Sequence, residues 1–189
     1  MQEGVYMLNI TVEKVFATTK PVFSFDAETN GLWGQAFAIA AVLFDENGAE
    51  TARFVGRCPI EGEVNPWVKD NVLPEMEGIQ VTHKSYKELL KDFIEFYMKN
   101  KEGADVLVHM GVPVESKLFI DAHEMGIMGD FDGPYPLVDC SAIPEIGTSV
   151  DTYNANNGIS IPSFEGGTHN PLYDSYAAAL AYRHWLINR

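Results

Sequence analysis

The sequence is poor in cysteine, in basic residues and in long apolar runs, and each shortage excludes a class of protein. Its two cysteines, Cys58 and Cys140, are too far apart for a recognisable metal-binding or redox pair. No apolar run approaches the roughly 20 residues needed to span a bilayer, so we expect no membrane association. The N-terminus lacks the basic and apolar regions of an export signal. We therefore expect a cytoplasmic protein whose thiols are buried and reduced.

The shortage of basic residues bears on the partners of the protein. Only 13 Lys and Arg residues stand against 27 Asp and Glu residues, which gives a net charge of −14. A protein that binds along many phosphates normally has a basic surface, because neutralising the phosphates supplies most of its affinity. Extended binding to a nucleic-acid duplex is therefore not expected. A short substrate that is bound at its end through metal ions is compatible with the acidic surface.

What is present fits one domain over residues 1–189, with residues 1–20 as an N-terminal extension. Alternating and β-branched patterns predict strands at 22–26, 37–44, 51–57, 105–109 and 137–139. Helical spacing of apolar residues predicts helices at 85–101, 114–125 and 171–187. This order implies an α/β fold, a mixed five-stranded sheet in which antiparallel hairpin strands are extended by parallel strands, flanked by helices. The strand at 105–109 is expected to lie beside the first strand.

Two carboxylates end the first predicted strand, in the sequence FSFDAETNGL. Asp26 and Glu28 are two residues apart, so in an extended chain they project from the same face. Carboxylate oxygens that converge at the edge of a sheet suit a hard divalent cation such as Mg²⁺. The alternative for an isolated pair of this kind is an acidic turn in solvent.

A second polar group opens the last predicted helix, in the sequence HNPLYD. Asn170 is a good N-cap, which places His169 in the preceding loop and Asp174 in the first turn or just beyond it. Two adjacent glycines within residues 163–168 give that loop freedom to open and close, so we expect the imidazole to point away from the carboxylates when no substrate is bound. The alternative for Asp174 is that it only interacts favourably with the helix dipole. The alternative for His169 is an ordinary position in a surface loop.

In this order the motifs resemble those of the DEDDh family of 3′–5′ exonucleases, which have an RNase H-like fold. The resemblance covers residues 21–186, and the segments 26–32 and 169–174 are each close to the family form. Asp139, after a hydrophobic residue, matches a weaker family feature. The resemblance implies that clustered carboxylates bind two divalent ions, Mg²⁺ or Mn²⁺, and that His169 is the general base.

The middle motif departs from the family pattern. The family has a strand ending in His-Asn, a short loop and an Asp at the head of a helix. In this chain His109 is followed by Met110, and Glu115 stands at the position of the Asp. Glutamate is also an oxygen ligand, with one more methylene group. We therefore take Glu115 as the fourth acidic residue, with Asp121 further along the helix as its nearest substitute.

The implied reaction is hydrolysis of the terminal phosphodiester bond at the 3′ end of single-stranded DNA, RNA or short oligonucleotides, with release of 5′-mononucleotides. Asp26, Glu28 and Asp174 would bind one metal, and Glu115 would assist a second. Thr29 and Leu32 would contact the terminal nucleotide. Trp33 and Phe37 are candidates for stacking on bases, with core packing as the simpler role for Phe37.

A second function class stays open. It is a catalytically weakened family member that binds nucleotides or protein partners, as the altered middle motif and the acidic surface suggest. The sequence also leaves open the preference for DNA or RNA and the oligomeric state, a homodimer included.

Overall fold

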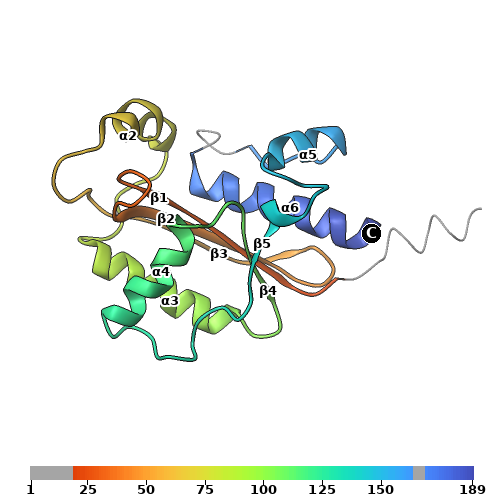
Figure 1. The fold of residues 1–189 in the computed structure, drawn as a ribbon, viewed down its shortest axis with the longest axis horizontal. Coiled ribbons are helices and arrows are strands. Elements are labelled where there is room, and N and C mark those ends of the chain that lie inside the picture. The colour runs from red at the N-terminus through yellow and green to blue at the C-terminus, as the bar shows by residue number, and fades with distance from the viewer. Residues whose placement is uncertain (1–18, 164–168) are drawn as a thin grey trace, which may run out of the picture.

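A computed structural model describes residues 19–163 and 169–189. Most of the predicted N-terminal extension and of the glycine-containing loop, residues 1–18 and 164–168, therefore lies outside the described residues. Within the described residues, a five-stranded sheet has helices on both faces (Figure 1). None of the helices in these two ranges has the length and apolar character required to cross a membrane.

The strand order in the sheet is β3-β2-β1-β4-β5. β1 pairs antiparallel with β2, and β2 antiparallel with β3, whereas β4 runs parallel to β1 and β5 parallel to β4. The predicted mixed sheet is confirmed, including the position of β4 beside the first strand. The strands are β1 (Val22–Thr29), β2 (Ala36–Phe44), β3 (Glu50–Arg57), β4 (Asp105–Val108) and β5 (Leu137–Asp139).

Helices α3 and α4 cover one face of the sheet, and α5 and α6 lie on the other (Figure 1). The predicted helices correspond to α3 (Tyr86–Asn100), α4 (Val114–Glu124) and α6 (Pro171–Asn188). The sequence pattern missed the short helices α2 (Pro66–Asn71) and α5 (Val150–Asn156) and the 3₁₀ turns η1 (Leu73–Met76) and η2 (Cys140–Ala142).

The alternation of side chains along β1 separates an apolar face from an acidic one. Phe23 and Phe25 are fully buried against α3 and α4, where the ring of Phe25 lies 5.6 Å from that of Phe119 in an edge-to-face arrangement. Asp26 and Glu28 point to the opposite side, toward α6. One strand therefore contributes to the aromatic core and presents two carboxylates to the other layer.

Small side chains allow α6 to pack closely on this second face. The alanines at 177–179 are buried at the helix surface, and Ala40 of β2 is fully buried below. The hydroxyl of Ser175 shares its one hydrogen between the carbonyl oxygen of Pro171 within α6, at 2.6 Å, and that of Ala40 in β2, at 3.2 Å. Because Ala40 is the cross-strand partner of Asp26, this contact brings the neighbouring Asp174 over Asp26.

The C-terminal half of α6 is anchored by one buried arginine. The Nη1 atom of Arg183 donates to Thr19 Oγ1 at 2.8 Å and to the carbonyl oxygen of Asp45 at 2.7 Å, and Nη2 lies 3.3 Å from the carbonyl oxygen of Glu46. These bonds join α6 to the turn between β2 and β3, so the position of the helix is fixed at both ends.

We predict that Arg183→Ala lowers the free energy of unfolding by about 2 kcal/mol, because charged hydrogen bonds to carbonyl groups are lost. Urea denaturation of the purified variant measures this loss. Arg189→Ala is the matched control, since that guanidinium lies over the Trp185 ring at the C-terminal end. Equal stabilities of the two variants would contradict the anchoring role.

Candidate active site

The first carboxylates lie inside β1 and not at its end. The sequence pattern predicted a strand that stops at Asp26, whereas the antiparallel ladder with β2 continues to the pair of Thr29 with Ala36, with an irregular register after Glu28. Main-chain hydrogen bonds of the sheet therefore fix the backbone of both acidic residues. The predicted turn follows directly, with Gly31 at a φ of +87°.

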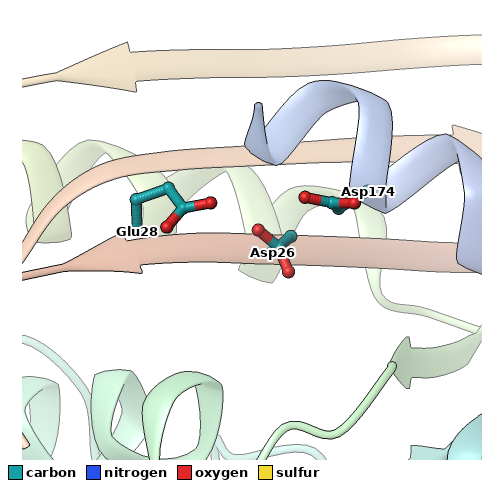
Figure 2. A group of neighbouring side chains, drawn as sticks. All are labelled: Asp26, Glu28 and Asp174. Atoms are coloured by element: carbon teal, nitrogen blue, oxygen red, sulfur yellow. The ribbon is translucent and has the colours of Figure 1, made fainter. Parts of the chain in front are cut away.

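Three carboxylates converge between β1 and the start of α6 (Figure 2). Asp26, Glu28 and Asp174 each have an oxygen atom within 4.8 Å of the other two. Asp174 is in the first turn of α6, which begins after its N-cap Asn170, whose side chain accepts a hydrogen bond from the main-chain N–H of Leu172 at 3.0 Å. The two segments that carry the acidic motifs thus meet in one cluster.

Glu115 approaches this cluster from the other side of the sheet edge. It lies in the first turn of α4, is 4% exposed, and its Oε1 accepts a hydrogen bond from the main-chain N–H of Ala27 at 3.1 Å. The parallel pairing of β1 with β4 ends at Ser24 and Leu107, so the N–H of Ala27 has no partner in β4. The Glu115 carboxylate accepts its hydrogen bond instead.

Asp121, the alternative to Glu115, has different partners. Its carboxylate accepts a hydrogen bond from the Tyr86 hydroxyl at 2.7 Å and pairs with Lys117 at 2.5 Å. It follows Glu115 by six residues, which rotates it by about 240° around the helix. The geometry therefore favours Glu115 over Asp121, but the described carboxylates whose oxygens lie within 4.8 Å of one another are Asp26, Glu28 and Asp174, without Glu115.

His169 lies against the carboxylates, contrary to the expectation that it would point away from them. Its Nδ1 is 3.8 Å from Glu28 Oε1. The reason is local: its main-chain N–H donates to Asp174 Oδ2 at 3.1 Å, its φ is +71°, and its ring contacts the edge of Trp67 at 5.4 Å between centroids.

Burial and mutual repulsion alter the acidity of the whole group. Burial, followed by the charges of Glu115, Asp174 and Glu28, raises the pKa of Asp26 well above its ordinary value. Burial likewise raises the pKa of Glu28, that of Asp174 to about 7 and that of Glu115 to about 8. The adjacent Glu28 carboxylate raises the pKa of His169 against the opposing effect of burial. Without a cation, several of these acids retain protons near neutral pH.

A pocket of about 350 Å³ adjoins the cluster. Thr29 and Leu32, predicted to contact a terminal nucleotide, line it together with Glu28 and His169. Trp33 is 74% exposed in the turn after β1 and is not part of the pocket lining, and Phe37 is 1% exposed in the core.

The pocket contains an aromatic residue to which the sequence analysis gave no role. Trp67, 56% exposed at the start of α2, lines the pocket beside His169. Asn65 caps α2, and its main-chain N–H donates to Asn30 Oδ1 at 2.8 Å. An N-cap residue followed by Pro is a local sign of such a helix, but the contact of Trp67 with the site depends on the bond between Asn65 and Asn30.

Asp139 acts on the loop between β4 and α4. Its two carboxylate oxygens accept hydrogen bonds from the main-chain N–H groups of Met110 and Gly111, each at 3.0 Å. Met110 has a φ of +57°, a conformation that these bonds stabilise. Asp139 thus positions the loop that leads to Glu115.

The acidic group suits a divalent cation. Octahedral Mg²⁺ with oxygen ligands at about 2.1 Å keeps those oxygens roughly 3–4 Å apart. Oxygens of Asp26, Glu28 and Asp174 that lie within 4.8 Å of one another need only small side-chain movements to reach that arrangement. The ligand set is all oxygen, which favours Mg²⁺ or Mn²⁺ over softer metals.

Comparison with known proteins supports the fold. No protein-family model matches the chain, and no curated protein matches its sequence. Among solved structures, S. pombe Pop2p in its Mg²⁺- and Mn²⁺-bound form is similar, with a TM-score of 0.62 and 12% sequence identity over 94% of this chain and 87% of that chain. Together with the mixed sheet, this likeness shows an RNase H-like fold. At that identity it shows the fold alone.

The raised pKa values predict how stability depends on pH. A carboxyl group with a higher pKa in the folded than in the unfolded protein makes the folded state bind more protons between the two values, so stability falls as pH rises through that window. For Asp174 the window runs from 3.8 to about 7, and for Glu115 from 4.5 to about 8.

We therefore expect the melting temperature in EDTA to fall from about pH 5 to about pH 8. Saturating Mg²⁺ should raise it more at pH 8 than at pH 5, because the ion binds the ionised carboxylates. Calorimetry at both pH values measures this. If the melting temperature of the metal-free protein instead increased from pH 5 to pH 8, the pKa values of the clustered carboxyl groups would not be raised.

Replacing one acid tests the repulsion separately. In EDTA at pH 9, above the pKa of about 8 that burial gives Glu115, we predict that Glu115→Gln raises the melting temperature. The amide oxygen still accepts from Ala27, whereas one of the clustered charges is gone. Glu124→Gln, at an exposed position of the same helix, should leave it unchanged. A lower melting temperature for Glu115→Gln would show that the Glu115 carboxylate is not repelled by the other three carboxylates.

Proposed function

We propose that this protein is a metal-dependent 3′–5′ exonuclease that acts on single-stranded nucleic acid or short oligonucleotides and releases 5′-mononucleotides. The proposal combines the resemblance of the motifs to DEDDh exonucleases with the likeness of the fold to Pop2p, which has been solved with Mg²⁺ and Mn²⁺ bound. On this proposal the present chain binds two divalent ions, Mg²⁺ or Mn²⁺.

One observation carries the proposal. Asp174 is far along the chain from Asp26 and Glu28, yet the three carboxylates have oxygens within 4.8 Å of one another, with His169 3.8 Å from Glu28. Burial of like charges costs stability unless a cation is bound. Such an arrangement is typical of a site that is selected for chemistry and not for folding.

The divalent ions would lower the pKa of an attacking water and stabilise charge on the leaving 3′ oxygen. Asp26, Glu28 and Asp174 would bind them, and Glu115, whose charge raises the pKa of Asp26, would support the second ion. In His169 the Nδ1 atom faces Glu28, which favours a proton on Nδ1 and leaves the Nε2 lone pair free to accept a proton. Thr29 and Leu32 would orient the terminal nucleotide in the adjoining pocket.

The direct test is incubation of a 5′-labelled single strand with Mg²⁺ or Mn²⁺. We expect the label to move to strands that are shorter by one nucleotide at a time, with 5′-mononucleotides in solution. EDTA, Asp26→Asn and Asp174→Asn should each abolish the reaction, and Glu124→Gln should not. The absence of mononucleotides with both metals, for DNA and for RNA, would refute the proposed reaction.

The second candidate function is a catalytically weakened binding module. Two observations favour it. Glu115, the residue proposed to support the second metal, already accepts a hydrogen bond from the Ala27 N–H with its Oε1 atom, so one of its two oxygens is occupied. In addition, Met110 stands where the family has Asn. The same assay separates the two functions, because a binding module would bind the labelled strand in the presence of Mg²⁺ without shortening it.

His169 provides the sharpest prediction for the reaction. His169→Ala should reduce the rate by about 10²–10⁴, the usual range for loss of a general acid–base group, while Mn²⁺ binding persists. Added imidazole should restore part of the rate, and the limb of the pH–rate profile near the imidazole pKa should disappear.

The matched control is His123→Ala, which removes a partly exposed imidazole paired with Asp130 on the outside of α4. Near-normal turnover of His169→Ala, or a retained limb in its pH–rate profile, would show that another group accepts the proton.

A further inference from the structure

Seven of the described cationic side chains are already engaged in contacts within the fold. Four of them form ion pairs with nearby acids, namely Lys20 with Asp105, Arg53 with Glu50, Lys91 with Glu95 and Lys117 with Asp121. Three others donate to main-chain oxygens, namely Arg57, Lys101 and Arg183. These contacts hold the seven side chains within the fold, so none of them is a free cation beside the pocket.

The lining of the pocket is also poor in positive charge. Within the described residues it contains no Lys or Arg, and its polar members are Glu28, Thr29, Asn65 and His169. Lys69, exposed on α2 two residues after Trp67, is the nearest lysine along the chain. A strand that entered this site would meet no row of cations that could neutralise successive phosphates.

Exposed apolar side chains, and not basic ones, line the pocket at Leu32 and Trp67 and occupy the loop after β4 at Met110 and Val112. Leu32 is 62% exposed, Trp67 56%, Met110 55% and Val112 76%. They stand on α2 and on the loops that follow β1 and β4, and because those two strands are parallel, both loops lie at the same end of the sheet. Apolar and aromatic surfaces bind the faces of unstacked bases, not phosphates.

The volume of the pocket sets the size of what it binds. Small-molecule pockets span roughly 300–1,000 Å³, and about 350 Å³ is near the lower end of that range. This gives room for one nucleotide unit beside the metal ligands. The net charge of −14 opposes the approach of every further phosphate.

From these observations, and resting on the proposed exonuclease function, we propose that the substrate is a short single-stranded oligonucleotide that is bound through its terminal nucleotide alone. The terminal base lies in the pocket against Trp67 and Leu32, and the terminal phosphodiester lies at the carboxylate cluster. Nucleotides further from the end add no affinity. A dinucleotide is therefore as good a substrate as a long strand.

The test compares 5′-labelled strands of two, four and twelve nucleotides. Binding is measured by fluorescence anisotropy with the slow variant His169→Ala in Mg²⁺, and kcat/KM is measured with the wild-type protein. We expect Kd and kcat/KM to differ by less than about threefold among the lengths, with a slope of log affinity against log salt that is shallower than about −1, against roughly −4 for six phosphate contacts.

The possible results distinguish a failure of this inference from a failure of the proposed exonuclease function. If the twelve-nucleotide strand binds more than about tenfold tighter than the dinucleotide, with a slope steeper than about −2, the end-only inference is overturned while the exonuclease function stands. If wild-type protein hydrolyses none of the strands with Mg²⁺ or Mn²⁺, the proposed function fails and the inference fails with it.

Two variants locate the binding surface. Trp67→Ala should raise KM about tenfold for every length, the cost of one lost stacking contact, and Trp67→Phe should restore most of it. Lys69→Ala should change neither KM nor its salt dependence. A KM that rises with Lys69→Ala in proportion to strand length would show a phosphate contact and overturn the inference.

Discussion

The burial of clustered carboxylates, together with their mutual repulsion, is the physical constraint on which the rest of this structure depends. Asp26, Glu28 and Asp174 share one small volume, and Glu115 lies close enough to add to the raised pKa of Asp26. Burial of this kind is unfavourable for each ionised group. The rest of the fold must supply the stability that the cluster removes, and the aromatic packing of Phe25 against α3 and α4 on the opposite face of β1 is one source of it.

The fold produces the cluster through a few short-range rules that act together. Alternation along β1 sends the aromatic side chains to one layer and the acids to the other. Alanine-rich packing lets α6 approach the sheet, and the hydrogen bond from Ser175 to Ala40 sets its position along β2. Because Ala40 pairs with Asp26, the register of a hairpin determines where Asp174 lies. The distance between two carboxylates is thus controlled by residues that take no part in the chemistry.

The local parts of this arrangement were predictable from the sequence, and the tertiary parts were not. The shared face of Asp26 and Glu28 follows from a period of two residues, and the start of α6 follows from Asn170 and Pro171, because each depends on neighbours along the chain. Trp67 was missed because its place beside His169 depends on a bond between the distant Asn65 and Asn30. The bond of Glu115 to the Ala27 N–H depends on where β4 stops pairing with β1. The place of His169 beside Glu28 could not be read from the sequence, because it depends on the bond from its main-chain N–H to the Asp174 carboxylate.

The central claim is that the carboxylate cluster binds two divalent metal ions beside a nucleotide pocket. Crystals grown with Mn²⁺ and a nucleoside 5′-monophosphate, with anomalous scattering recorded for manganese, test it most directly. The account predicts two manganese peaks, one coordinated by Asp26, Glu28 and Asp174 and a second that shares Asp26, with the base in the pocket against Trp67. Manganese found only at surface acids, with the cluster free of any anomalous peak, would contradict it.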